Sequence, residues 1–363
     1  MSYFNMELMS LTDLLLYDEK LASLPWNYSP TSPNSFNKVL TEEGLKPCES
    51  IVALPEYILD LRSLMELTLH NCKSLATLPD SIGHLQALTV FKLSCCTSLK
   101  KLPESIGQLD SLSTFELYHC TSLIELPETI GQLRSLTMFN LTFCISLREL
   151  PESIGQLHSL TRFNLICCLS VVTLPETIGQ LHSLTDLDLG HGQFMELPES
   201  IGQLQLLTMF VLSYCSLVTL PESIGQLRSL RVLKLERDIS LTALPESIGQ
   251  LVNLKELELK ECRSLKSLPN SIKMMKSLEK CESLSSGLPE EEICRVNRVI
   301  EINRNRSERF PYTPNQLDVG LMLYIMSLKQ GETGIRQIIA DYLGVSYTGA
   351  VKRWEEEIRI EKN

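Results

Sequence analysis

A single dipeptide recurs at almost constant spacing along most of this chain, and no other feature restricts its fold as strongly. Between residues 54 and 269, Leu-Pro occurs ten times at steps of 24 residues, except for two steps of 23. A fixed period of this length indicates a stack of similar units instead of one globular core. The dipeptides begin at Leu54, Leu78, Leu102, Leu126, Leu150, Leu174, Leu197, Leu220, Leu244 and Leu268.

One complete unit, residues 102–125, predicts one strand and one short return. Phe115 and Leu117 alternate with outward positions at 114, 116 and 118, which favours a strand. The segment LPESIGQL has Pro where a first helical turn tolerates it and Gly107 against a longer helix. We therefore expect short helical or 3₁₀ returns. Since one unit cannot bury its apolar side alone, the units should stack, with a parallel sheet on the concave face of a solenoid.

The residues of this unit resemble a known family. Leu112, Phe115, Leu117, Cys120 and Leu123 follow L-x-x-L-x-L-x-x-C-x-x-L, which is similar to leucine-rich repeats. With LPESIGQL on the return, the unit resembles the repeats of plant intracellular resistance receptors and of Ras-group-related leucine-rich repeat proteins. The resemblance implies an α/β leucine-rich repeat solenoid that acts in plant-type innate immunity (disease resistance) or intracellular signalling. The nucleotide-binding loop G-x-x-x-x-G-K-[ST] of such receptors does not occur in this sequence.

Three regions follow from the decay of the pattern at both ends. Residues 1–50 are interpreted as a degenerate first repeat with a looped insertion, and residues 51–289 as the array of 23–24-residue units. Residues 290–363 predict a small all-α module, in which Ile293, Val296, Val299 and Ile300 have the spacing of a capping helix. Because Leu278 is followed almost directly by residues 281–284, we expect part of the last strand to be missing. The start in mid-repeat leaves a truncated receptor remnant as an alternative.

Seven of the twelve cysteines occupy one position of the repeat. There the chain turns inward, and a small side chain with a weak S–H donor can bond a backbone carbonyl. Stacking makes the sulfurs parallel neighbours, so we predict buried free thiols and no disulfides. No C-x-x-C pair supports a metal site, and we predict neither metal nor cofactor. Reduced thiols imply the cytoplasm, or the nucleus. This cysteine ladder comprises Cys72, Cys96, Cys120, Cys144, Cys168, Cys215 and Cys262.

The outward strand positions differ from unit to unit, whereas LPESIGQL hardly changes. In the middle of the array they include Met and aromatic residues, with charges toward the ends, which is typical of a protein-binding surface. Drift after duplication is the alternative, because isolated exposed apolar residues are common. The residues predicted to bind a protein partner on the concave face are Tyr118, Met138, Asn140, Phe143, Arg162, Asn164, Ile166, Asp186, Asp188, Met209, Val211 and Tyr214.

Asp186 and Asp188 raise the question of catalysis, because paired carboxylates can serve as acid and base. Such chemistry needs a pocket that shifts their pKa values, and an open sheet provides none. We therefore expect an ionic contact to a basic partner, no enzyme and no small-molecule substrate. The sequence favours a non-catalytic protein-recognition scaffold.

Charge and hydropathy argue against two other partners. The net charge of −11 disfavours nucleic acid, and the longest apolar run, 319–328, is about half the ~20 residues that cross a membrane. Most of the acid surplus comes from the Glu of each LPE, interpreted as a by-product of duplication. Residues 338–353 resemble a helix-turn-helix, so a DNA-binding regulator is a second alternative, although residues 290–363 carry 11 basic against 12 acidic side chains.

Overall fold

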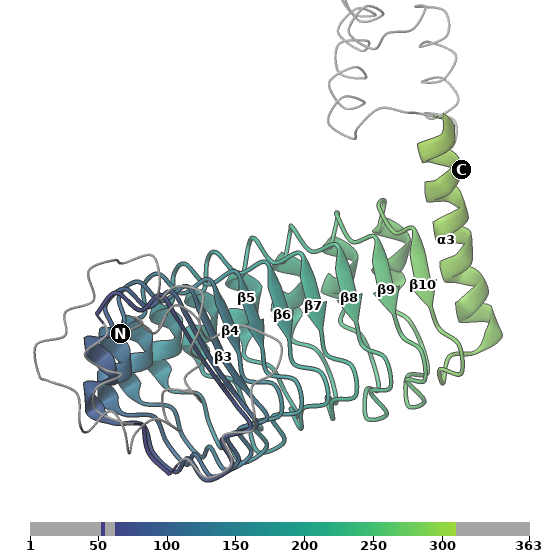
Figure 1. The fold of residues 1–363 in the computed structure, drawn as a ribbon. Coiled ribbons are helices and arrows are strands. Elements are labelled where there is room, and N and C mark those ends of the chain that lie inside the picture. Colours follow the sequence, from purple (N-terminus) through teal and green to yellow (C-terminus); the bar gives the residue numbers. More distant parts are fainter. Residues whose placement is uncertain (1–51, 55–61, 310–363) are drawn as a thin grey trace, which may run out of the picture. The chain divides into compact units, whose positions relative to one another are not determined.

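The computed structural model describes residues 52–54 and 62–309. Within them, ten strands form one parallel sheet in chain order (Figure 1). Each strand is the second half of a unit, so the predicted repeat architecture is confirmed. The strands are β1 (Glu66–His70), β2 (Val90–Ser94), β3 (Thr114–Tyr118), β4 (Met138–Asn140), β5 (Arg162–Asn164), β6 (Asp186–Asp188), β7 (Met209–Val211), β8 (Val232–Lys234), β9 (Glu256–Glu258) and β10 (Lys280–Glu282).

A five-residue 3₁₀ turn follows each Leu-Pro from Leu78 to Leu268. In the unit of β3, Pro103 is extended, with φ −71° and ψ 152°, and the turn begins at Glu104. An added Cβ at Gly107 would lie 2.4 Å from the carbonyl oxygen of Thr129 in the next repeat, so only glycine allows this close stacking. The turns are η3 (Asp80–His84), η4 (Glu104–Gln108), η5 (Glu128–Gln132), η6 (Glu152–Gln156), η7 (Glu176–Gln180), η8 (Glu199–Gln203), η9 (Glu222–Gln226), η10 (Glu246–Gln250) and η11 (Asn270–Met274).

The Glu of LPE has a structural role, which corrects its interpretation as a by-product. Glu128 Oε2 accepts the N–H of Ser153 in the next repeat at 3.3 Å. Glu246 accepts the N–H groups of Asn270 and Ser271, both at 3.0 Å, and two further units repeat the contact. The first N–H groups of a helical turn have no partner within the turn. These carboxylates therefore join neighbouring repeats.

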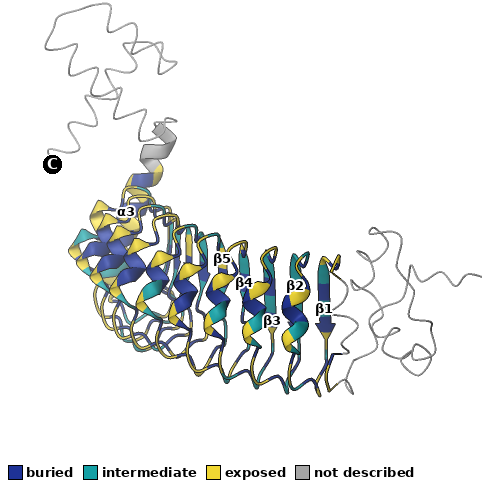
Figure 2. Cartoon of the chain, turned by 90° about the vertical axis from the view of Figure 1, so that its left-hand side faces the viewer, coloured by how far each residue is buried: buried dark blue, intermediate teal, exposed yellow. Residues whose placement is uncertain are grey.

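The inward strand residues form one continuous core from repeat to repeat (Figure 2). Phe91, Phe115, Phe139 and Phe163 are fully buried and stack in a row, with ring centroids 5.3 to 5.6 Å apart. At the same position, β8 and β9 carry leucine. The core is thus built by superposing equivalent residues of successive units.

The first of the two 23-residue units compensates for its missing residue by exchanging side-chain volume. Gly192 replaces the ladder cysteine, and a Cβ there would lie 2.4 Å from the ring of Phe194. Phe194 is fully buried and stands where other units have Leu or Val. The larger ring therefore fills the space that the cysteine side chain leaves.

The second short unit is completed by a hydrogen bond from its neighbour. In a full unit, the N–H of Leu147 bonds to the carbonyl of the ladder cysteine at 3.1 Å. The equivalent N–H of Leu217 instead bonds to Asp238 Oδ2 at 3.1 Å. Asp238 occupies the ladder position of the following repeat and is fully buried. A buried carboxylate thus satisfies the donor that the deletion left without a partner.

The C-terminal end of the array differs from expectation in one respect. The last strand is present, because Lys280 and Glu282 of β10 pair in register with Glu256 and Glu258 of β9; the expected loss was wrong. Helix α3 (Glu290–Arg309) follows, and its residues 296 and 300 join the core. The predicted capping helix is therefore confirmed.

The remaining parts of the chain lie outside the described residues. These include the degenerate first repeat and insertion within 1–50 and the helix-turn-helix resemblance at 338–353, so the domain boundaries stay predictions. The chain divides into two compact units, 1–300 and 301–363. Among the described helices, none has the length and apolarity of a membrane span.

Candidate functional site

The parallel register places the outward side chains in rows across the sheet. Asn140, Asn164 and Asp188 follow one another from β4 to β6 in this way. All twelve predicted partner-binding residues lie on β3–β7 or just after these strands, and we call them the central surface. Tyr118, Arg162, Met209 and Tyr214 are exposed, and the other eight are half-buried. Their binding role stays a prediction.

One residue per repeat, just after the strand, has a left-handed backbone that was not predicted. None of these residues is glycine, although a left-handed conformation costs other residues about 1 kcal/mol. The N–H of Phe143, for example, bonds to the Ile166 carbonyl at 2.8 Å, which holds the turn. The column comprises Asn71, Cys95, His119, Phe143, Cys167, His191, Tyr214, Arg237, Glu261 and Ser285, with φ from 57° to 63°.

Aromatic side chains of this column contact each other at two places. The Phe143 ring packs edge-on against Tyr118, with ring centroids 5.9 Å apart, and its centroid lies 5.7 Å from that of the His119 ring. Further along the sheet, the His191 ring stacks on the Tyr214 ring, with centroids 4.1 Å apart and an angle of 15° between the ring planes. Such contacts fix ring orientation before any partner binds. The sequence analysis missed both histidines. Comparing equivalent positions of successive units would have found them, because Phe143 follows His119 by 24 residues and Tyr214 follows His191 by 23.

Tyr214 is also contacted from the following repeat. The Arg237 guanidinium lies 5.3 Å from the ring centroid and bonds to Glu261 Oε1 at 2.9 Å. The ring is therefore supported by the repeats on either side, and part of it stays exposed. A rigid, partly exposed tyrosine is a typical anchor of a protein interface.

Charges on the sheet are paired toward both ends. Lys92 bonds to Glu116 at 3.2 Å near the N-terminal end. On β8–β10 a network includes Lys234–Glu258 at 3.2 Å and a contact between Lys280 and Glu256. Each pair joins neighbouring strands through residues 24 apart, so reading opposite charges at the repeat period could have found them.

The middle of the sheet carries charges without such pairs. Arg162 lies opposite Asp186 in the register, and no ion pair among the described residues includes either of them or Asp188. Burial raises the pKa of Asp188, an effect partly offset by the Gly190 N–H at 2.9 Å. The predicted pair of carboxylates is thus open to an external cation.

A second apolar area was missed by the sequence analysis. It lies on the segments between the strands and the next Leu-Pro, where the first three units carry Lys or Thr and three later units carry Ile or Leu. Comparing this position across units would have revealed it. Its exposed members are Ile145, Leu169, Val172, Met195, Val218 and Ile239.

One group of three carboxylates among the described residues is close enough to hold a metal ion: Glu256, Glu258 and Glu282. The ammonium of Lys280 already bonds to all three, at 3.8 Å to Glu258 and 2.6 Å to Glu282. The cation of this cluster is therefore a side chain of the protein itself.

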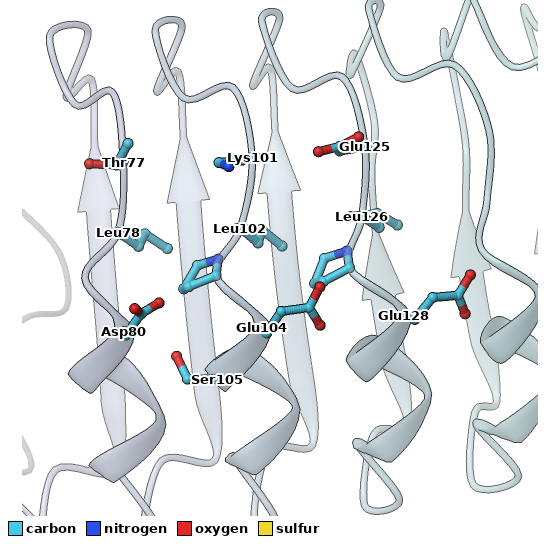
Figure 3. A pocket seen from close by; sticks show the side chains of 12 residues that line it. Thr77, Leu78, Asp80, Lys101, Leu102, Glu104, Ser105, Glu125, Leu126 and Glu128 are labelled. Carbon is cyan, nitrogen blue, oxygen red and sulfur yellow. The ribbon is translucent and has the colours of Figure 1, made fainter.

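A groove of about 630 Å³ lies on the return side of the first described repeats (Figure 3). Leu78, Leu102 and Leu126 form its floor, and Glu104 and Glu128 stand beside it. Ser105 in its lining has a buried hydroxyl without a hydrogen-bond partner among the described residues, so no base there is positioned to activate it. The groove offers an acidic surface.

The seven ladder cysteines are buried and free. Cys144 donates to the Leu117 carbonyl at 3.0 Å, and Cys262 to the Leu235 carbonyl at 2.9 Å. Burial raises the pKa of Cys144 and Cys215 to about 12. The thiols of Cys144 and Cys215 therefore stay protonated and poorly nucleophilic at neutral pH.

Comparison with known proteins gives likeness only at the level of structure. No family model matches the chain, and neither does any curated protein. A leucine-rich repeat protein of Leptospira interrogans is 24% identical over 73% of this chain and 94% of its own, with a TM-score of 0.37. The leucine-rich repeat domain of the type III effector XopL is 24% identical over 66% and 73%, with a TM-score of 0.45.

A third similar structure comes from Drosophila. The chain from the Drosophila Toll–Spätzle complex is 18% identical over 67% of this chain and 39% of its own, with a TM-score of 0.49. At such identities the likeness concerns the fold alone. On the sheet and turns described above, the chain has the leucine-rich repeat fold.

Proposed function

We propose that this chain is a non-catalytic recognition scaffold that binds a protein partner on the central surface. The carrying observation is the set of preoriented aromatic and apolar side chains on β3–β7. Tyr118 and Tyr214 remain partly exposed while neighbouring rings hold them. A stiff surface of this kind loses little conformational entropy on binding.

The proposal extends to where the protein acts. The repeat resembles those of plant intracellular resistance receptors, which supports a role in plant-type innate immune recognition or intracellular signalling. Free buried cysteines support the cytoplasm, or the nucleus, as the compartment.

The experiment compares partner capture by three versions of the full chain. Tyr118→Ala combined with Met138→Ala should reduce the affinity for the captured partner about 30-fold, since interface anchors contribute about 2 kcal/mol. Both side chains point outward, so the melting temperature should not change. Val232→Ala, an outward residue of β8 in the paired region, serves as the matched control. Unchanged capture by the double variant would contradict the proposal.

A further inference from the structure

The two outward aspartates of β6 differ from every outward glutamate on β2–β10. Each of those glutamates belongs to an ion pair with a lysine, which lies one repeat away except for Lys280, the partner of Glu282 on the same strand. Asp186 and Asp188 belong to no ion pair among the described residues. The glutamates in question are Glu116, Glu236, Glu256, Glu258 and Glu282.

No cation of the described residues forms an ion pair with these aspartates, although Arg162 lies opposite Asp186 in the register. Burial raises the pKa of Asp188, and the charges of His191 and Lys234 partly offset this rise. Lys234 is two strands away from Asp188 in the register and bonds to Glu258 at 3.2 Å. Val211 stands between Asp188 and Lys234. The apolar strand β7 therefore separates the carboxylates from the nearest ionic network.

Each carboxylate uses one oxygen locally. Asp186 Oδ2 accepts the hydroxyl of Thr185 at 2.6 Å, and Asp188 Oδ1 accepts the Gly190 N–H at 2.9 Å. These bonds hold the two short side chains in place. The second oxygen of each accepts no hydrogen bond from the described residues, and each is therefore available to an external donor.

The surroundings fit a long cationic side chain. Met209 is in register with Asp186, and Val211 with Asp188. Lysine and arginine pack their aliphatic stems on apolar surface while their charged ends reach a polar partner. An arginine can donate to both carboxylates through its planar fork.

We propose that the central surface binds a protein segment whose arginine or lysine ends at Asp186 and Asp188, while apolar residues of that segment cover Met209, Val211 and Tyr214. The inference rests on the proposed function and specifies the chemistry of the partner. A divalent cation fits less well, because Ca²⁺ takes 6–8 oxygen ligands, and these two carboxylates belong to no group of three in the described part of the chain.

A random-peptide display library, panned against the full chain under reducing conditions, tests this directly. Selected peptides should share a basic residue flanked by apolar ones, and their binding should weaken with salt. Asp186→Asn with Asp188→Asn should reduce affinity roughly 10- to 100-fold, the range for charge-assisted hydrogen bonds. Glu256→Gln with Glu258→Gln, an equivalent outward pair already bonded to lysine, should leave affinity unchanged. Circular dichroism checks that both variants fold.

The outcomes separate this inference from the proposed function. Two results would overturn the inference alone, in peptides whose binding is lost on Met209→Ala. One is that these peptides lack a basic residue, and the other is that they bind the asparagine variant as well as the wild type. Peptides that tolerate both sets of changes, or a library without binders, count against both. Calorimetric titration with CaCl₂ provides a further arm, because binding that disappears in the asparagine variant would make the carboxylates a metal site and overturn the inference.

Discussion

The central strands β4–β7 and the C-terminal strands β8–β10 share one backbone geometry but present different surfaces. On β8–β10 each outward lysine finds a glutamate one repeat away. On β4–β7 apolar residues, asparagines and unpaired aspartates occupy the same rows. Exposed ion pairs contribute little to stability, and a surface already satisfied internally has little to offer a partner. The comparison indicates that the part of the sheet without internal ion pairs is the part best able to bind a partner.

The largest expected effect concerns Asp238, a buried carboxylate in the repeat of β8. Burial raises the pKa of Asp238 to about 7 from 3.8, so the folded state binds its proton more tightly than the unfolded chain. This group therefore stabilises the fold less as pH rises from about 4 to 8, by about 4 kcal/mol in total. Asp238→Asn should remove that fall in stability, because an amide does not titrate between pH 4 and pH 8. Its oxygen can still accept the Leu217 N–H. Urea unfolding at both pH values measures it.

The control for this measurement is Val232→Ala, which changes no titratable group and should leave the pH dependence as it is. A difference between the Asp238 variant and the wild type that stays the same at pH 4 and pH 8 would show that the buried carboxylate does not carry the effect.

A smaller effect should follow from Lys280→Met, which breaks the paired network. Lys280 lowers the pKa of Glu256, so its stabilisation is present above the ordinary carboxyl pKa and is lost as pH falls through the lowered value. The variant should melt below the wild type at pH 7, with the difference shrinking at pH 3. Millimolar CaCl₂ should raise the melting temperature of the variant alone. Lys255→Met, from a more exposed pair, is the control.

The smallest effect concerns the border between the two regions. Arg237→Ala removes the cation that lies over Tyr214 and leaves His191 as its stacking partner. A peptide selected on the central surface should bind about two- to fivefold more weakly, because an exposed cation–π contact contributes about 0.5–1 kcal/mol. Fluorescence anisotropy measures this. A variant that binds as well as the wild type would show that Tyr214 needs no support from β8.

Much of the fold was predictable because equivalent positions repeat. Leu117 and Cys120 recur at fixed spacing since each stacks on its counterpart in the next unit. The candidate surface could be predicted for the same reason, because alternation along β3–β7 distinguishes outward from inward residues. The side-chain pairs 24 residues apart were also accessible, but only by reading across units instead of along them.

Other features depend on departures from the repeat. Gly192 and Asp238 break the cysteine ladder, and the repeat pattern alone does not explain why. Phe194 and the N–H of Leu217 provide the explanation, because a one-residue deletion must be compensated in volume in one unit and in hydrogen bonding in the next. The left-handed column was equally hidden, since its residues include Phe and Tyr where glycine would be expected.

By itself, the sequence determined the period, the parallel order of the strands and which side chains face outward, because each of these depends on spacing along the chain. Only the tertiary structure decided which charges are satisfied, which rings are held and which carboxylates remain open. Those properties depend on atoms of neighbouring repeats brought within a few ångströms. Lys280 among three glutamates and Asp188 without a lysine differ in neighbours, although both regions follow the same pattern of alternation.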